Sequence, residues 1–248
     1  MFPALIHAII LLSLTLQGQD NSDTQNAMKG LVNAHNAWGA KMSSPNTSLE
    51  IKESSRSGNE MKFRLRAKGM PRDKIYTIVQ WPVTHNDPVA IIRGVTLDAT
   101  GQAVCAGTAG TCSSDEPNDP IDILVLPVAG EPLRLGLVSE DGDTRVLGKI
   151  VPVPLRGEDR GCSIEGVLLT PAAELVLVTG SGFPAGSELT MDADSEGEHH
   201  SAKVKAGTDG QYMTALGPYK QGVSRGTAKV TLKSAGCSPT VTIPWGHN

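Results

Sequence analysis

Residues 69–77, GMPRDKIYT, and residues 182–190, GFPAGSELT, share one pattern: glycine, a large apolar residue, proline, two turn residues, then an alternating strand. Glycine tolerates a positive φ angle and proline fixes its own φ, so each stretch predicts a sharp turn into a β-strand. The recurrence indicates that one structural unit occurs twice in the chain.

Two further landmarks follow each of these turns in the same order. A glycine-containing turn recurs as LDATGQAV at 97–104 and AGTDGQYM at 206–213, and each half closes with strand, turn and strand at 134–154 and 228–246. Short runs of Val, Ile, Leu and Thr between Gly, Pro and Asp favour antiparallel sandwiches. The sequence therefore predicts an all-β fold, with one β-sandwich at 46–155, a polar linker at 156–161 and a second β-sandwich at 162–246. The dipeptides Asp141-Gly142 and Asp209-Gly210 are predicted hairpin turns.

The C-terminal half resembles a known kind of domain. GSGFPAGSEL at 180–189, TDGQY at 208–212 and VTIPWG at 241–246 resemble bacterial immunoglobulin-like domains that occur in tandem on exported proteins. The resemblance implies two antiparallel immunoglobulin-like sandwiches that act as spacers, adhesion modules or binding accessories. It departs from antibody-type domains, whose disulfide joins central strands beneath a Trp, because a Cys162–Cys237 bridge would tie the first strand to the last.

The N-terminus, MFPALIHAIILLSLTLQGQD, has an apolar run from Leu5 to Leu16 that is too short to span a bilayer. Its length is typical of a signal peptide, here residues 1–18, although no Lys or Arg precedes it. A buried apolar strand or helix is the alternative. We expect a secreted or periplasmic protein with no stable membrane insertion, because no other stretch is long and apolar enough.

Residues 19–45 form a polar leader before the first sandwich. Its apolar positions follow one helical stripe, so it is predicted either as a short helix docked on the first domain or as a flexible leader. The residues of this stripe are Met28, Leu31, Val32, His35 and Trp38. We expect His35 to be a packing or capping residue rather than a ligand.

Composition narrows the class of partner. Hydrophobic residues make up 39% of the chain, which supports packed cores, and the net charge is -4. A nucleic-acid binder needs a basic face to neutralise phosphates, so we expect no nucleic acid. The charges are interspersed without a polybasic block, and the expected partner is another protein or a cell-surface polymer.

The four cysteines, Cys105, Cys112, Cys162 and Cys237, predict two disulfides in an exported chain. Three pairings are open. Cys105 and Cys112 flank the short stretch AGTAGT, whereas Cys162 and Cys237 lie near the two ends of the C-terminal half. The alternative of a four-cysteine zinc site lacks the usual C-x-x-C pair.

The stretch MDADSEGEHH at 191–200 is the chemically densest in the chain. Because side chains alternate along a strand, Asp192 and Asp194 are predicted to face solvent, and His199 and His200 to face opposite sides. A turn at SEGE places Asp194 opposite His199 and Asp192 opposite Ser201. Asp192, Asp194 and His199 are therefore a candidate Ca²⁺ or Zn²⁺ site. The alternative, which we favour, is charge pairing on a solvated face.

A second acidic stretch, CSSDEPNDPID at 112–122, carries the same two interpretations. Its carboxylates could ligate calcium, but acidic loops rich in proline are usually only solvated. The residues concerned are Asp115, Glu116, Asp119 and Asp122.

Motifs of catalysis are missing from the sequence. It has no G-x-S-x-G, no H-E-x-x-H and no P-loop. Sites that cleave sugars usually present aromatic side chains, of which this chain has few. Trp81 and Trp245 are predicted to plug the ends of the cores. We expect an exported, non-catalytic structural or interaction protein with no catalytic residue and no cofactor. The alternatives are an exported metal- or ligand-binding protein that uses the Asp192, Asp194 and His199 face, and a divergent extracellular hydrolase.

Overall fold

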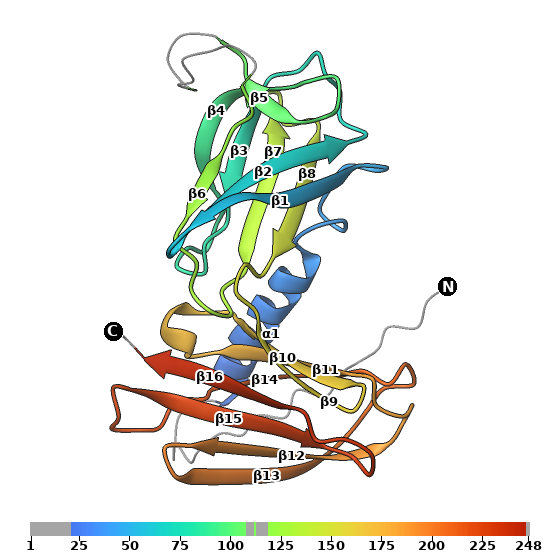
Figure 1. The fold of residues 1–248 in the computed structure, drawn as a ribbon, viewed down its shortest axis with the longest axis vertical. Helices are drawn as coiled ribbons and strands as arrows, with labels where there is room; N and C mark the ends of the chain where they lie inside the picture. Colours follow the sequence, from blue (N-terminus) through green and yellow to red (C-terminus); the bar gives the residue numbers. More distant parts are fainter. Residues whose placement is uncertain (1–20, 108–111, 113–118, 247–248) are drawn as a thin grey trace. The chain divides into compact units, whose positions relative to one another are not determined.

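The computed structural model describes residues 21–107, 112 and 119–246 (Figure 1). The predicted signal peptide, and Asp115 and Glu116 of the acidic loop, lie outside these residues. Within the described part the chain is mainly β, and it divides into two compact units. Among the described residues, no helix has the length and apolar character needed to cross a bilayer.

The N-terminal sandwich comprises the described residues of 34–128 and 132–152. Its first sheet has the order β1-β2-β6, formed by Ser48–Ser57, Glu60–Lys68 and Ile123–Val125. Its second sheet has the order β5-β4-β3-β7-β8, formed by Ala103–Cys105, Val89–Leu97, Tyr76–Gln80, Leu133–Ser139 and Arg145–Ile150. All pairings are antiparallel, and Figure 1 shows β1 and β2 crossing over the strands of the second sheet.

The C-terminal sandwich comprises the described residues up to Asn33, 129–131 and 153–246. Its first sheet has the order β14-β11-β10-β9, formed by Tyr212–Leu216, Val176–Ser181, Cys162–Leu168 and Leu155–Asp159. Its second sheet has the order β13-β12-β15-β16, formed by Glu198–Lys205, Glu188–Ser195, Arg225–Lys233 and Thr240–Gly246. A short 3₁₀ helix, η1 at Pro171–Ala173, precedes β11. The predicted fold class, all-β with two antiparallel sandwiches, is confirmed.

The glycine that opens each G-x-P turn has the same role in its own sandwich. Gly69 has φ of 73° and Gly182 has φ of 81°, and both lie against the backbone that precedes a strand. A Cβ on Gly69 would stand 2.2 Å from the carbonyl oxygen of Asn46, and one on Gly182 would stand 2.3 Å from that of Gly161. Only glycine meets both the positive φ and the close approach.

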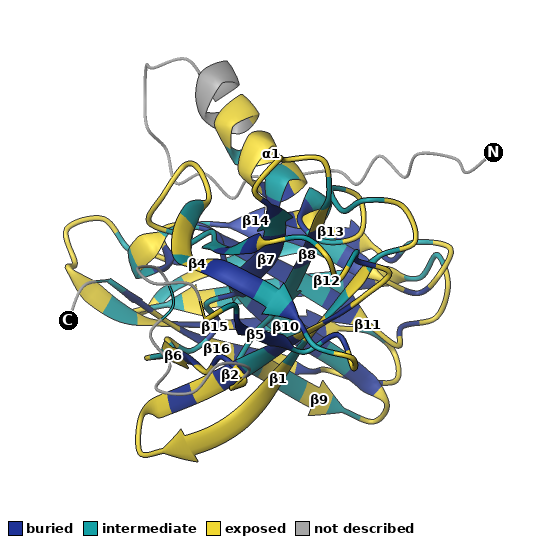
Figure 2. Cartoon of the chain, turned by 90° about the horizontal axis from the view of Figure 1, so that it is seen from above, coloured by how far each residue is buried: buried dark blue, intermediate teal, exposed yellow. Residues whose placement is uncertain are grey.

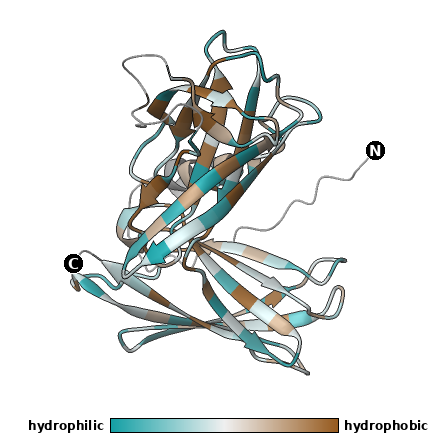
Figure 3. Cartoon of the chain, turned by 45° about the horizontal axis from the view of Figure 1, so that its top comes forward, coloured by the Kyte–Doolittle hydropathy of each residue, from teal (hydrophilic) through white to brown (hydrophobic). Residues whose placement is uncertain are grey.

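Alternation along the strands builds the cores. In β2 the apolar residues are buried and the polar residues between them face outward, as Figures 2 and 3 show. The C-terminal core is formed from both of its sheets by residues that include Ile164, Val178, Leu189, Met191, Val230 and Ile243. Trp245 belongs to this core, as predicted, and its Nε1 donates to Ser195 Oγ at 3.0 Å.

The segment predicted as a linker, residues 156–161, is not one. Residues 155–159 form β9, which pairs with β10 in the C-terminal sandwich, with Gly157 opposite Ile164. A Cβ on Gly157 would stand 1.7 Å from the carbonyl oxygen of Thr240. The glycine that suggested flexibility therefore allows the backbone of β9 to approach that of β16. The C-terminal sandwich begins near residue 153 instead of 162.

The leader contains helix α1, Asn21–Ala37. Of the predicted stripe, Val32 is buried and Met28 packs with it against Leu175 and Leu177 of the C-terminal sandwich, whereas Leu31 is 38% exposed. The prediction of a helix is confirmed, but it was wrong about Leu31. It was also wrong about the domain, because helix residues up to Asn33 belong to the C-terminal sandwich and only those from Ala34 to the N-terminal one.

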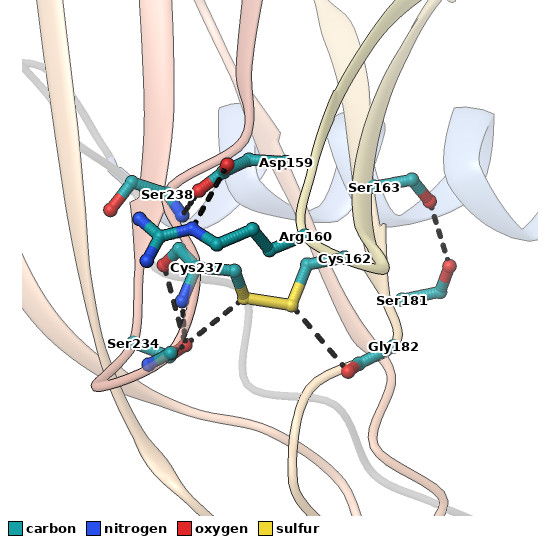
Figure 4. Close-up of a disulfide and its surroundings, with 10 residues drawn as sticks. Asp159, Arg160, Cys162, Ser163, Ser181, Gly182, Ser234, Cys237 and Ser238 are labelled. Atoms are coloured by element: carbon teal, nitrogen blue, oxygen red, sulfur yellow. Dashed lines mark hydrogen bonds and ion pairs between the residues drawn. A yellow bond between two sulfur atoms is a disulfide. The ribbon is translucent and has the colours of Figure 1, made fainter.

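The disulfides join Cys105 to Cys112 and Cys162 to Cys237. Cys162 opens β10 and Cys237 lies in the loop between β15 and β16, where its N–H donates to Ser234 Oγ (Figure 4). The prediction that this bridge ties the first strand to the last was wrong, because β9 and not β10 is the first strand of the C-terminal sandwich along the chain. This disulfide closes a loop of 75 residues, which restricts the unfolded chain and contributes about 4–5 kcal/mol to the free energy of unfolding.

The two predicted hairpin turns have different outcomes. Asp141-Gly142 lies in the turn between the paired strands β7 and β8, where Gly142 donates to the carbonyl of Ser139. Asp209-Gly210 connects β13 to β14, which belong to different sheets, so this prediction of a hairpin was wrong. Gly210 there lies against the carbonyl oxygen of Phe183.

Candidate functional site

The register of the acidic hairpin is the one predicted from the sequence. In the β12–β13 pair, Asp194 lies opposite His199 and Asp192 opposite Ser201. Asp194 and His199 are exposed, whereas His200 lines the other side of the sheet. There it faces a cavity of about 30 Å³, which is enough for water but not for a larger ligand. The strand period alone determined these positions.

A lysine of β15 lies beside each of the two carboxylates on this face. Lys233 Nζ lies 2.7 Å from Asp192 Oδ2, and this contact, with a hydrogen bond from Ser201, lowers the pKa of Asp192. Asp194 lies opposite Lys229 on its other side. Among the described residues, no group of three His, Cys, Asp or Glu side chains is placed to hold a metal ion. Asp192 is therefore engaged in an ion pair with Lys233 of β15.

The second acidic candidate is also engaged. Asp122 accepts from Arg64 Nε at 2.8 Å and Nη2 at 3.2 Å, and from Ser54 Oγ at 2.7 Å. These contacts, led by Arg64, lower the pKa of Asp122. The Asp122 carboxylate thus forms an ion pair with Arg64 on the outer side of the β1-β2-β6 sheet.

That outer side carries a feature not predicted from the sequence. Lys62, Arg64, Arg66 and Lys68 alternate with buried residues along β2, so all four point outward in one row. Alternate residues on a strand lie about 6.7 Å apart, which sets the spacing of the charges. In Figure 3 the alternation of hydrophobic and hydrophilic residues is visible along this strand. We call these four residues, with Lys52 of β1, the basic face.

The partner strand completes the basic face. Across β1 and β2, Ser48 lies opposite Lys68, Glu50 opposite Arg66 and Lys52 opposite Arg64. A β-bulge between Glu53 and Ser55 shifts the register, after which Ser55 lies opposite Lys62. Five basic side chains thus share a surface with four carboxylates, those of Glu50, Glu53, Glu60 and Asp122, in a chain whose net charge is -4.

The basic face is hollowed. An open depression of about 300 Å³ is lined by Glu50, Lys52, Glu53, Ser54, Arg64, Arg66 and Gln102. Gln102 is held there because its Nε2 donates to the carbonyl of Leu65 at 2.9 Å. Cationic groups, carboxylates, a hydroxyl and an amide therefore surround one space, which suits a polar, charged ligand rather than an apolar one.

The corresponding sheet of the C-terminal sandwich presents a different surface. On its outer side Leu175, Leu177 and Ala215 are buried beneath Val32 of α1. An apolar outer face needs such a cover, whereas none of the described residues covers the basic face of the N-terminal sandwich, as the yellow segments of β1 in Figure 2 show. The sheet is thus built to face water or a polar partner.

The N-terminal sandwich also contains a cluster of three basic residues, His35, Arg134 and Lys149, of which His35 and Arg134 are buried. Burial, then the charges of Lys149 and Arg134, lowers the pKa of His35 to about 3. Arg134 Nη2 donates to the neutral His35 Nδ1 at 3.3 Å. Burial, Arg134 and Lys41 lower the pKa of Lys149 to about 8. His35 is a buried packing residue, as expected from the sequence.

Trp81 does not plug a core. It is half-buried, and its ring centroid lies 5.3 Å from that of Trp38, with the Arg134 guanidinium 4.9 Å from its ring centre. Its Nε1 donates to the carbonyl of His85 at 2.9 Å. The cation–π contact shows that Trp81 helps to hold the buried arginine.

The sequence contained a signal for the basic face. EMKFRLRAK at 60–68 alternates strictly between polar and apolar residues, and four of its polar positions after Glu60 are basic. A search for contiguous blocks of charge overlooks residues that are separated along the chain but adjacent on a strand face.

No protein-family model matches the chain, and no curated protein is detectably similar to it.

Proposed function

We propose that this chain is an exported, non-catalytic interaction protein, an adhesion or scaffold module built from two copies of one sandwich unit. Two disulfides fit an oxidising compartment outside the cytosol. The shared order of β4-β3-β7-β8 and β13-β12-β15-β16, together with the equivalent glycines Gly69 and Gly182, supports duplication.

The observation that carries the proposal is the basic face. It is exposed and hollowed, and it lies on a rigid sheet whose inner residues Phe63 and Leu65 are buried. Such a surface is suited to binding a partner. The pKa shifts around its depression are those of ion pairs, Glu53 with Arg56 and Arg64 with Asp122. A hydrolytic centre instead needs acids or bases tuned by burial within a cavity.

Two measurements test this proposal. N-terminal sequencing of the protein recovered outside the producing cells should show a mature form that begins near residue 19. The labelled mature protein should bind in a saturable manner to envelopes of those cells. Retention of residues 1–18 in cytosolic material, or failure to bind envelopes, would contradict the proposal.

The hydrolase alternative predicts that the protein cleaves an envelope polymer. Incubation of the mature protein with envelope polymers should leave their length unchanged for an interaction protein. Shortening of a polymer that is not seen with heat-unfolded protein would favour the hydrolase instead.

A further inference from the structure

We propose that the basic face binds an anionic polysaccharide along strand β2. This inference rests on the proposed interaction function and deepens it by naming the chemistry of the partner. The ligand is a chain of sugars that carries carboxylate, sulfate or phosphate groups.

The charge pattern of strand β2 supports such a ligand. Lys62, Arg64, Arg66 and Lys68 repeat at about 6.7 Å on one line, and they face outward from a strand whose other side is buried. A linear polymer with regularly spaced anionic groups complements such a row. The chain as a whole is acidic, so this local excess of positive charge is opposite in sign to the net charge.

The like charges on the basic face also reduce the stability of the sheet. Lys52 lies directly opposite Arg64 on the outer side of the sheet. Like charges at opposed positions destabilise a sheet, and Asp122, which pairs with Arg64 and also interacts with Lys62, offsets part of this repulsion. Lys62 and Lys68 lie opposite neutral serines, Ser55 and Ser48. A bound polyanion would remove the repulsion, which gives a physical reason for keeping the charges together.

The depression favours a sugar chain over a nucleic acid. Ser54, Gln102 and the carboxylates of Glu50 and Glu53 line the same space as the basic groups. Hydroxyl, amide and carboxylate groups hydrogen-bond sugar hydroxyls. The outward residues of β1 and β2 also contain no aromatic side chain on which a base could stack.

The test uses the mature full-length protein and polygalacturonate, with neutral dextran and a DNA oligonucleotide of matched charge as comparisons. Affinity is measured by calorimetry at several salt concentrations. Binding to polygalacturonate should weaken as salt rises, and it should exceed binding to dextran and to DNA.

The test variant combines Lys52→Gln, Lys62→Gln and Lys68→Gln. Loss of three surface charge contacts should weaken polygalacturonate binding by about 10-fold. The melting temperature should stay the same or rise, because the repulsion between Lys52 and Arg64 is gone. The matched control, Lys205→Gln, Arg225→Gln and Lys229→Gln, removes three exposed charges from the C-terminal sandwich and should bind as the wild type does.

Three results would overturn the inference: equal weakening by both triple variants, tighter binding to DNA, or no polygalacturonate binding at low salt. Envelope binding separates this inference from the proposed function. If the Lys52, Lys62 and Lys68 variant still binds envelopes as the wild type does, the protein is an interaction module that uses another surface, and only the inference fails.

Discussion

At the scale of single residues, glycine and a buried histidine show how local chemistry constrains this chain. Gly182 and Gly186 occur in the same loop and both have a positive φ, yet only Gly182 lies against a neighbouring backbone carbonyl. His35 is 6% exposed in a cationic surrounding. The surroundings of Gly182 and of His35 each lead to a prediction that the sequence motif alone does not supply.

Gly182→Ala should destabilise the C-terminal sandwich by about 2 kcal/mol or more, because the new Cβ meets the carbonyl oxygen of Gly161 in addition to the strain of a positive φ. Gly186→Ala is the matched control. Its Cβ meets nothing closer than Lys205 Cε at 3.9 Å, so it should cost only about 1 kcal/mol for the backbone conformation. Urea unfolding measures both, and equal losses would show that the close approach carries no cost.

His35→Gln should flatten the pH dependence of stability between about pH 6.5 and pH 3. In the folded protein the pKa of His35 is lowered to about 3, so the imidazole stays neutral where the unfolded chain is already protonated. Falling pH therefore favours the unfolded state, by up to about 1.4 kcal/mol per pH unit. The contribution of His35 is complete above pH 6.5 and is lost as pH falls towards 3.

The measurement for His35 is the free energy of unfolding at several pH values, with His199→Gln as the exposed control. The wild type should lose stability relative to His35→Gln as the pH decreases. If the two curves run parallel, protonation of His35 is not coupled to unfolding.

At the scale of elements, helix α1 and strand β9 complete the C-terminal sandwich although both precede the predicted domain boundary. The helix covers the apolar outer face of the β14-β11-β10-β9 sheet through Val32 and Met28. Strand β9 packs close to β16 through Gly157. Neither element has a strong signal of its own, because each depends on a surface that lies far away in the sequence.

Val32→Ala should destabilise the protein by about 2 kcal/mol, because it removes buried methyl groups from the contact with Leu175 and Leu177. Leu31→Ala, one position earlier on the same helix, changes a side chain that is 38% exposed and should cost less than about 0.5 kcal/mol. Chemical unfolding of the two variants measures the difference. A larger loss for Leu31→Ala would mean that the helix docks through another face.

At the scale of the whole molecule, the fold separates its charges into two kinds of surface. On the outer side of β12, β13 and β15, carboxylates and lysines are interleaved, as in the pair of Asp192 with Lys233. On the outer side of β1 and β2, basic residues outnumber carboxylates and lie in one row along β2. The first surface is expected to be self-neutralising, and the second to need a partner.

The melting temperature of the whole protein should be the same with and without EDTA, because Asp192 is already paired with Lys233 and Asp194 lies opposite Lys229. A decrease of several degrees in EDTA that Ca²⁺ or Zn²⁺ reverses would favour the metal-binding alternative. Asp194→Ala combined with His199→Ala provides the check, since a metal effect at this site must disappear in that variant.

The sequence by itself determined the local features of this protein. Side-chain alternation and turn residues were enough to predict two antiparallel sandwiches and the opposition of Asp194 and His199. The helical stripe was enough to predict that His35 packs or caps rather than binds a ligand. These features depend on residues close together in the chain, for which the strand period and the φ preferences of Gly and Pro suffice.

Only the tertiary structure decided which surfaces are covered. It assigned residues 155–159 to the second sandwich, placed Trp81 against Trp38 instead of in a core, and left the outer face of β2 exposed. A strand sequence fixes which residues share a face, but whether that face meets water, a helix or another sheet depends on segments that are distant in sequence. The physical reason is that burial is a property of the folded chain, because the surface removed from water is shared between both partners of a contact.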